Sequence, residues 1–453
     1  MTAKLPYVPP TIRRNAVQQT NKFGYGLNAP VCEAIDGVPV NALIEEFGSP
    51  LFVYSERAIR SKVQAARRAF EKRYPKVKFA WSYKTCYLQA ICAIFHDEGS
   101  IAEVVSEFEY EKARKLGVPG RDILVNGPYK SESLLRRAID EKAKLHLDNL
   151  DELYELEAIA REKGTVVDVA IRVNMDTGLL PAWSKFGFNL ENGEAMQAIR
   201  RMKASGVLRL VGLHTHIGTF VLDARFYRTA SEKLIRLARQ AQSECGFEVD
   251  YFDLGGGFAS NNTLHAQYLP GEQVVPTFDQ YAEAICDTFT AEFAGSPKLP
   301  QLYLESGRAL IDEAGFLITS VIAQKHAPDG RRALIADCGV NMLYTTTWYR
   351  LRTMTARQVN APVSDTILYG PLCMNIDVVR ANVQLPPLEK GDALVLHPVG
   401  AYNVVQSMQF IMYRPPVVMI RSDGKPVVIR ERENLDYVEG MERMPASMQV
   451  SAG

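Results

Sequence analysis

Residues 77–126 read VKFAWSYKTCYLQAICAIFHDEGSIAEVVSEFEYEKARKLGVPGRDILVN. Three short apolar segments of this stretch, 77–83, 101–106 and 123–126, have the length of buried strands, and two longer amphipathic segments separate them. Strands that alternate with helices are typical of βαβ units, which build a parallel sheet. The stretch therefore predicts an α/β fold.

The same alternation continues along the chain as far as Glu305. Eight βα units within about 250 residues have the size of a (β/α)8, or TIM, barrel. A doubly wound parallel sheet is the alternative, because periodicity alone does not show whether a sheet closes. The five further strands are expected at 144–147, 167–173, 211–217, 251–254 and 301–305, and the helices at 87–96, 107–116, 131–140, 150–163, 193–203, 224–245 and 278–293.

After Glu305 the pattern changes to β segments with few helices between them, at 316–324, 332–336, 393–398 and 416–420. This change predicts a mostly-β C-terminal domain. We expect five parts: an N-terminal arm (1–34), a segment whose strand at 50–54 joins the β domain (35–57), the barrel (58–310), the β domain (311–443) and a mobile tail (444–453).

Composition narrows the range of functions. The 453 residues include 52 Lys plus Arg and 52 Asp plus Glu, so the formal net charge is zero and no overall field attracts nucleic acid or an anionic membrane. The seven cysteines have irregular spacings without a C-x-x-C pair, and no run of 18 apolar residues occurs. The N-terminus has no apolar signal core. We therefore expect a cytoplasmic protein with a small-molecule partner and without a structural metal.

Reactive side chains of a barrel lie at the carboxyl ends of its strands. The first strand ends at Lys84, and burial there would lower the lysine pKa and make the amine a nucleophile. An ordinary rim lysine is the alternative. The sixth strand carries His214 and His216, which alternate onto one face. With no carboxylate evident beside them, we expect a structural pair or a stacking platform rather than a metal site.

Two turns of small residues follow the seventh and eighth strands. They read Asp253-Leu-Gly255-Gly256-Gly257-Phe258 and Glu305-Ser-Gly307-Arg308. Consecutive glycines let backbone N–H groups approach an anion, and these two loops commonly form the phosphate site of a barrel. A tight βα turn is the alternative. A lysine, a phosphate cradle and an acid on one rim together suggest pyridoxal 5′-phosphate (PLP).

Six motifs occur in order along the chain. They are Phe79-Ala-Trp-Ser-Tyr-Lys84, His214-Thr-His216-Ile-Gly-Thr219, Gly255-Gly-Gly257-Phe258, Glu305-Ser-Gly-Arg308, Gly370-Pro-Leu-Cys373-Met-Asn-Ile-Asp377 and Gly400-Ala-Tyr402, and Lys185-Phe-Gly187 also fits. Over about residues 35–430 the chain thereby resembles the fold-type III PLP-dependent decarboxylases, the family of diaminopimelate, ornithine and arginine decarboxylases. Their fold is an alanine-racemase-like barrel followed by a β domain.

The resemblance implies a role for each matching residue. Lys84 would be the Schiff-base lysine, His216 would stack on the pyridine ring, and Glu305 would pair with the pyridine nitrogen. Cys373 would reach the partner's site across a homodimer interface and protonate the carbon that has lost carbon dioxide. The other implied cofactor residues are Glu103 and Arg172 near the cofactor, the phosphate-binding set Thr219, Gly255, Gly256, Gly257, Gly307 and Arg308, and Tyr402 at the phosphate or the substrate.

Two substrate-reading charges of the family are missing. Diaminopimelate decarboxylases place an acid after the cysteine and an arginine after Asp-x-Gly-x-Asn, whereas this chain has Met374 and Thr345 there. Arg308 and Tyr349 remain. We therefore expect PLP-dependent decarboxylation of an amino acid or amino-acid conjugate other than meso-diaminopimelate. The alternatives are a true meso-diaminopimelate decarboxylase that makes L-lysine, a PLP-dependent amino-acid racemase, and a non-catalytic PLP carrier.

Overall fold

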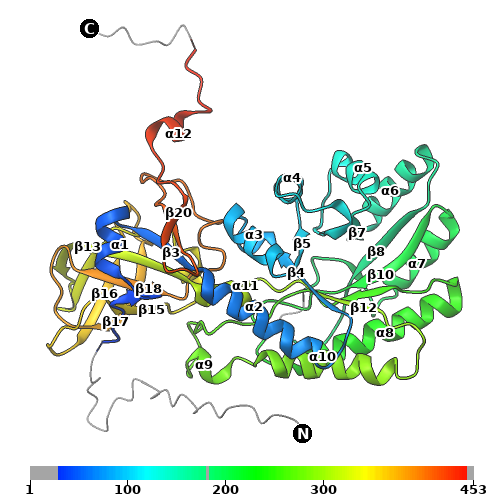
Figure 1. The fold of residues 1–453 in the computed structure, drawn as a ribbon, viewed down its shortest axis with the longest axis horizontal. Coiled ribbons are helices and arrows are strands. Elements are labelled where there is room, and N and C mark those ends of the chain that lie inside the picture. The colour runs from blue at the N-terminus through cyan, green and yellow to red at the C-terminus, as the bar shows by residue number, and fades with distance from the viewer. Residues whose placement is uncertain (1–28, 180–182, 446–453) are drawn as a thin grey trace.

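The computed structural model describes residues 29–179 and 183–445 of the chain. Figure 1 shows two bodies, a barrel surrounded by helices and a mostly-β domain beside it. The polypeptide enters the β domain first, crosses into the barrel and returns to the β domain after Leu304. Most of the expected arm 1–34 and of the expected tail 444–453 lies outside the described residues.

The barrel is closed, which decides against the doubly wound alternative. Its eight strands pair in parallel in the order of the chain, and β12 returns to pair with β4 through Leu302 and Val77. Its strands are β4 (Val77–Ser82), β5 (Ile101–Val104), β6 (Ile123–Val125), β7 (Lys144–Leu147), β8 (Val167–Asn174), β10 (Leu208–His214), β11 (Tyr251–Asp253) and β12 (Gln301–Leu304). The short β9 (Phe188–Asn189) adds to the end of β8.

Helices between the strands cover the outside of the barrel (Figure 1). Several begin where the sequence supplies a capping side chain: Ser106, Ser131 and Asn149 each accept a hydrogen bond from a backbone N–H in the first turn. With α2 before the first barrel strand and α11 after the last, the helices of this part of the chain are α2 (Glu56–Glu71), α3 (Gln89–Asp97), α4 (Glu107–Lys115), α5 (Glu132–Asp140), α6 (Leu150–Glu162), α7 (Glu194–Ser205), α8 (Arg225–Cys245), α9 (Gly271–Val274), α10 (Phe278–Glu292) and α11 (Arg308–Ile311).

The sixth barrel strand lies three residues earlier than the sequence predicted. β10 ends at His214, where its pairing with both neighbours stops: His214 pairs with Arg172 of β8 and with Asp253, the last residue of β11. His216 therefore belongs to the loop after the strand. The expectation that His214 and His216 alternate onto one strand face is wrong, since only His214 is in the strand.

The β domain is built on a sheet that includes the segment before the barrel. β3 (Leu51–Ser55) pairs antiparallel with β13 (Gly315–His326) and parallel with β19 (Val417–Ile420). The other elements are β1 (Ala34–Ile35), β2 (Val38–Pro39), α1 (Val40–Phe47), β14 (Arg332–Ala336), β15 (Arg352–Thr355), β16 (Ser364–Tyr369), β17 (Val378–Leu385), β18 (Ala393–His397), β20 (Pro426–Arg430) and α12 (Leu435–Glu439).

The sequence did not reveal β15, β16, β17 and β20. β17 shows the reason, because its residues VVRANVQL are mostly partly or fully exposed and form no apolar run. Strands of this kind are held by pairing with β16 rather than by burial of their own side chains. Within the described residues, no helix is both long enough and apolar enough to cross a membrane.

Candidate active site

Lys84 lies immediately after β4, at the carboxyl end of the barrel. Its Nζ is 2.8 Å and 2.6 Å from Oε1 and Oε2 of Glu103 on β5, and Glu103 is fully buried. Burial alone would lower the pKa of Lys84, but the charge of Glu103, followed by that of Glu305, more than offsets it and raises the pKa. The expected depression of the Lys84 pKa is therefore wrong, and the lysine rests as an ammonium ion held by Glu103.

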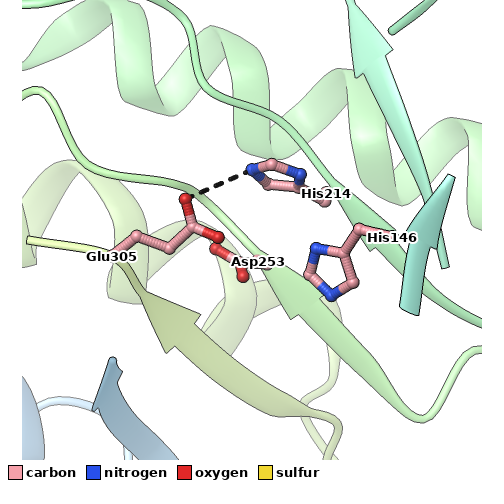
Figure 2. A group of neighbouring side chains, drawn as sticks. All are labelled: His146, His214, Asp253 and Glu305. Atoms are coloured by element: carbon pink, nitrogen blue, oxygen red, sulfur yellow. Dashed lines mark ion pairs between the residues drawn. The ribbon is translucent and has the colours of Figure 1, made fainter. Parts of the chain in front are cut away.

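Glu305 follows β12 on the same rim and is buried. Its Oε1 accepts a hydrogen bond from Nδ2 of Asn126, and its Oε2 is 3.5 Å from Nε2 of His214. Figure 2 shows that the carboxyl group of Asp253 also lies beside it, with His146 across the barrel interior. The expectation that no carboxylate lies near His214 is thus wrong. The sequence analysis missed Asn126, although its place directly after β6 was a usable signal.

His216 is held in one orientation by the turn after β11. Its Nδ1 accepts a hydrogen bond of 3.0 Å from the backbone N–H of Gly256, so the ring can carry its proton on Nε2. Burial, then the charges of Arg172 and Lys84, lower the pKa of His216 to about 3. His216 is therefore a neutral, fixed aromatic ring, which is what stacking on a flat cofactor requires.

The Gly255–Gly257 turn brings three loops into close contact. Gly255 and Gly257 have φ values of 65° and 95°, in the left-handed region that favours glycine. A Cβ on Gly255 would lie 2.6 Å from the carbonyl oxygen of Thr215, and one on Gly257 would clash with the carbonyl oxygen of Gly218. Thr219, the residue that follows Gly218, is exposed. The turn is therefore a cradle lined with backbone, of the kind that binds phosphate.

Arg308 lies in the neighbouring turn with its guanidinium between two tyrosine rings. The guanidinium carbon is 5.0 Å from the ring centre of Tyr349 and 4.7 Å from that of Tyr402. Arg308 is buried, its Nη1 is 3.6 Å from Oδ2 of Asp312, and neither Nε nor Nη1 finds a hydrogen-bond partner among the described residues. A buried guanidinium with free donors fits an anion such as a phosphate or a carboxylate.

Gly307 and Arg172 complete the rim. A Cβ on Gly307 would overlap the side chain of Thr85, so this turn packs directly against the loop that carries Lys84. The guanidinium of Arg172 lies 4.4 Å from the ring centre of Phe186 and 3.8 Å from Oδ1 of Asp148. The implied cofactor residues of the barrel thus gather at one rim, and a lysine, an acid, a neutral imidazole and an anion cradle fit PLP.

Tyr349 and Tyr402 of the β domain contact Arg308, whereas the candidate residues Cys373, Met374 and Thr345 have other surroundings. Cys373 is exposed in the loop between β16 and β17, and Met374 beside it is half-buried. Among residues 29–179 and 183–445, no hydrogen bond or ion pair joins Cys373 to the barrel rim. Thr345 is buried, and its Oγ1 donates a hydrogen bond of 3.0 Å to Oδ1 of Asn403. Within one chain, the sequence-predicted proton donor therefore stands outside the cofactor group.

Comparisons with known proteins agree with this chemistry. Residues 59–312 match the family described as "Pyridoxal-dependent decarboxylase, pyridoxal binding domain". The diaminopimelate decarboxylase of Archaeoglobus fulgidus is 30% identical over 91% of this chain and 97% of its own, and that of Aquifex aeolicus is 29% identical over 89% and 94%. A crystal structure of diaminopimelate decarboxylase from M. jannaschii in complex with L-lysine is 28% identical, with a TM-score of 0.82 over 92% of this chain and 97% of that one.

Proposed function

This chain belongs to the pyridoxal-dependent decarboxylase family, and from that membership we propose that it converts meso-diaminopimelate to L-lysine and carbon dioxide. The enzyme class and the cofactor are those of the family: a PLP-dependent carboxy-lyase. The observation that supports this substrate is the share of the chain over which the relatives match. Proteins named diaminopimelate decarboxylase match both the barrel and the β domain, and cover about nine-tenths of the chain.

The expectation of a different substrate finds no support in these relatives, which favour the lysine-forming alternative. The absence of the family's distal-group charges at Met374 and Thr345 nevertheless keeps a second candidate. Thr345 is buried, neutral and bonded to Asn403, so it cannot hold a distal carboxylate as an arginine would. The second candidate is therefore an amino acid or conjugate whose side chain lacks that pair of charges.

We assign cofactor binding to barrel residues that all belong to one chain. When bound, PLP accepts the electrons released as carbon dioxide leaves. Lys84, which now contacts Glu103, would hold the cofactor through its side-chain amine, and Glu305 would face the ring nitrogen. His216 supports the ring face, and the Gly255–Gly257 turn and Arg308 bind anionic groups.

The deciding experiment measures carbon dioxide release by the PLP-loaded protein from meso-diaminopimelate and from a panel of other amino acids. A kcat/KM above about 10⁴ M⁻¹s⁻¹, an ordinary enzymatic value, on meso-diaminopimelate supports lysine formation. Release only from another amino acid supports the second candidate. Loss of optical rotation from an optically active amino acid of the panel, without carbon dioxide from any substrate, would instead show a racemase and refute decarboxylation. Lys84→Ala is the inactive control in each assay.

We also propose a homodimer with two shared sites, in which Cys373 of each chain serves the other. Its support is the exposed position of Cys373, apart from the contacts of the barrel rim. Lys84→Ala and Cys373→Ala are each expected to be inactive or nearly so. Mixing them under conditions of subunit exchange should restore activity, because one hybrid site then has both wild-type residues. No recovery after demonstrated exchange would refute the shared site.

A further inference from the structure

Four buried side chains, from β7, β10, β11 and the residue after β12, meet inside the barrel (Figure 2). His146 lies on β7, His214 at the end of β10, Asp253 at the end of β11, and Glu305 directly after β12. All four are buried, and one polar atom of each lies within 4.8 Å of those of the others. The proposed function uses only Glu305, so the other three need an explanation.

Asp253 and Glu305 are two buried carboxyl groups with oxygen atoms within 4.8 Å of each other. Oδ1 of Asp253 accepts a hydrogen bond of 2.8 Å from the backbone N–H of Gly255, whereas Oδ2 has no hydrogen-bond partner among the described residues. Two neighbouring carboxylates cannot both ionise there without a large penalty. Burial, followed by the charge of Glu305, raises the pKa of Asp253 well above its usual value. The unpartnered Oδ2 is therefore the atom of Asp253 that can carry a proton.

The charged groups around the pair leave this proton in place. Lys84 donates a hydrogen bond to Glu103, and the guanidinium of Arg172 is 3.8 Å from Oδ1 of Asp148. Burial lowers the pKa of His214 and of His146 well below the usual value, so both imidazoles are neutral. The other titratable groups that face the cluster are Tyr251, which is 3.1 Å from Nε2 of His146, together with Tyr303, Lys130 and Lys144.

We propose that Asp253 is a positioning residue whose protonated carboxyl group donates a hydrogen bond to Glu305 and keeps that side chain aimed at the ring nitrogen of PLP. The inference rests on the proposed role of Glu305. A buried carboxylate needs donors, and Asn126 supplies one. If the second donor to Glu305 were a cation, it would weaken the electrostatic attraction between Glu305 and a protonated ring nitrogen. A neutral carboxylic acid can donate the same hydrogen bond without that effect. His214 and His146 complete the surroundings of Glu305, and because both are neutral they add no positive charge there.

Two substitutions of nearly the same shape separate this role from a merely structural one. In Asp253→Asn, the amide oxygen can accept from Gly255 and the amide nitrogen can donate to Glu305, as the protonated acid does. Asp253→Leu keeps the volume but removes the donor. Asp168→Asn is the matched control, because Asp168 lies on β8 with a half-exposed side chain paired with Arg209.

The measurement is the dissociation constant of the cofactor from each full-length protein, by fluorescence titration. Each is titrated with PLP and with a carbocyclic analogue in which C–H replaces the ring nitrogen. We expect Asp253→Asn and Asp168→Asn to bind PLP within about threefold of wild type. Asp253→Leu should bind it about 10- to 100-fold more weakly, the loss expected for one buried hydrogen bond to a charged group. All four proteins should bind the analogue alike.

Several results would overturn the inference. Asp253→Asn as weak as Asp253→Leu would show that Asp253 acts as an anion, and Asp253→Leu equal to wild type would show no role. Equal losses for PLP and the analogue would show general damage. Two histidines and two carboxylates are also a possible metal-ligand set. A stoichiometric metal in the purified holoenzyme that Asp253→Leu loses would replace the inference. Failure of the Glu305 role itself is seen separately, as unchanged PLP binding in Glu305→Ala.

Discussion

Replacing Gly257 by alanine tests whether the turn after β11 is shaped by backbone contacts. Gly257 has a φ of 95°, and its new Cβ would overlap the carbonyl oxygen of Gly218 and lie 2.9 Å from the hydroxyl of Tyr227. That hydroxyl donates a hydrogen bond of 2.6 Å to the carbonyl of Gly256. The carbonyl of Gly257 accepts another, of 2.9 Å, from the N–H of Val221. The added methyl must therefore push the two loops of the cradle apart.

The expected cost has two parts. A left-handed backbone costs a residue with a Cβ about 1–2 kcal/mol, and overpacking a tight contact costs about 1–3 kcal/mol more. We expect Gly257→Ala to lower the free energy of unfolding by about 2–5 kcal/mol. Gly206→Ala is the matched control, because Gly206 has a φ of 69° and nothing within 4 Å of its Cβ position. It should lose only the backbone part, about 1–2 kcal/mol.

Cofactor binding gives the second readout. Separation of the cradle loops should weaken PLP binding about 10- to 100-fold, or about 1.4–2.8 kcal/mol, whereas Gly206→Ala should bind PLP as wild type does. Urea unfolding of the apoprotein and fluorescence titration with PLP measure the two effects. If Gly257→Ala matches Gly206→Ala in both, the turn does not need its backbone contacts and the cradle assignment is wrong.

Three further predictions concern groups with one clear physical role. Burial, then the charge of Glu103, raises the pKa of Glu109 to about 7, so the folded protein holds that proton more tightly than the unfolded chain. Wild type should lose about 3 kcal/mol of stability from this group as pH rises from about 4.5 to 7. Glu109→Gln should lack that loss in urea unfolding at pH 5 and pH 8, and equal pH dependence in the two proteins would contradict it. Lys130→Met leaves Glu152 buried without its partner, which lies 2.7 Å away, and should lower the free energy of unfolding by about 3–5 kcal/mol. Adding Glu152→Leu should recover most of it, and no recovery would rule out the unpaired charge as the cause. Cys373→Ala should lower kcat about 10²-fold with unchanged PLP affinity, and an unchanged kcat would remove Cys373 from the mechanism.

The barrel could be predicted because its signals are local. Each of its strands is a short apolar run, and the loops that follow carry Lys84, Gly255–Gly257 and Glu305. Chain order alone then places these residues on one rim, because parallel strands all end on the same side. The shift of β10 shows the limit of such signals, since the sequence offers Ile217 as a further apolar residue whereas the pairing with β11 stops at His214.

The chemistry of the rim depends on pairs that the sequence does not show. The pKa of Lys84 is set by Glu103, and the surroundings of Glu305 by Asn126, His214 and Asp253, which belong to other strands. Burial of Lys84 suggested a lowered pKa, yet a carboxylate at 2.6 Å reverses the direction. Only the closed barrel brings these side chains within reach of one another.

The proposed cofactor residues of the barrel strands and the loop residues Cys373 and Met374 lie on different parts of the chain. Lys84, His216 and Glu305 sit at or just after buried strand ends, where a shift would disturb the barrel itself. Cys373 and Met374 lie on a loop between two partly exposed strands of the β domain. Replacing a loop side chain there alters no barrel contact. The proposed cofactor residues of the barrel are thus tied to strand pairing, whereas the side chain at position 374 can change without disturbing a barrel strand.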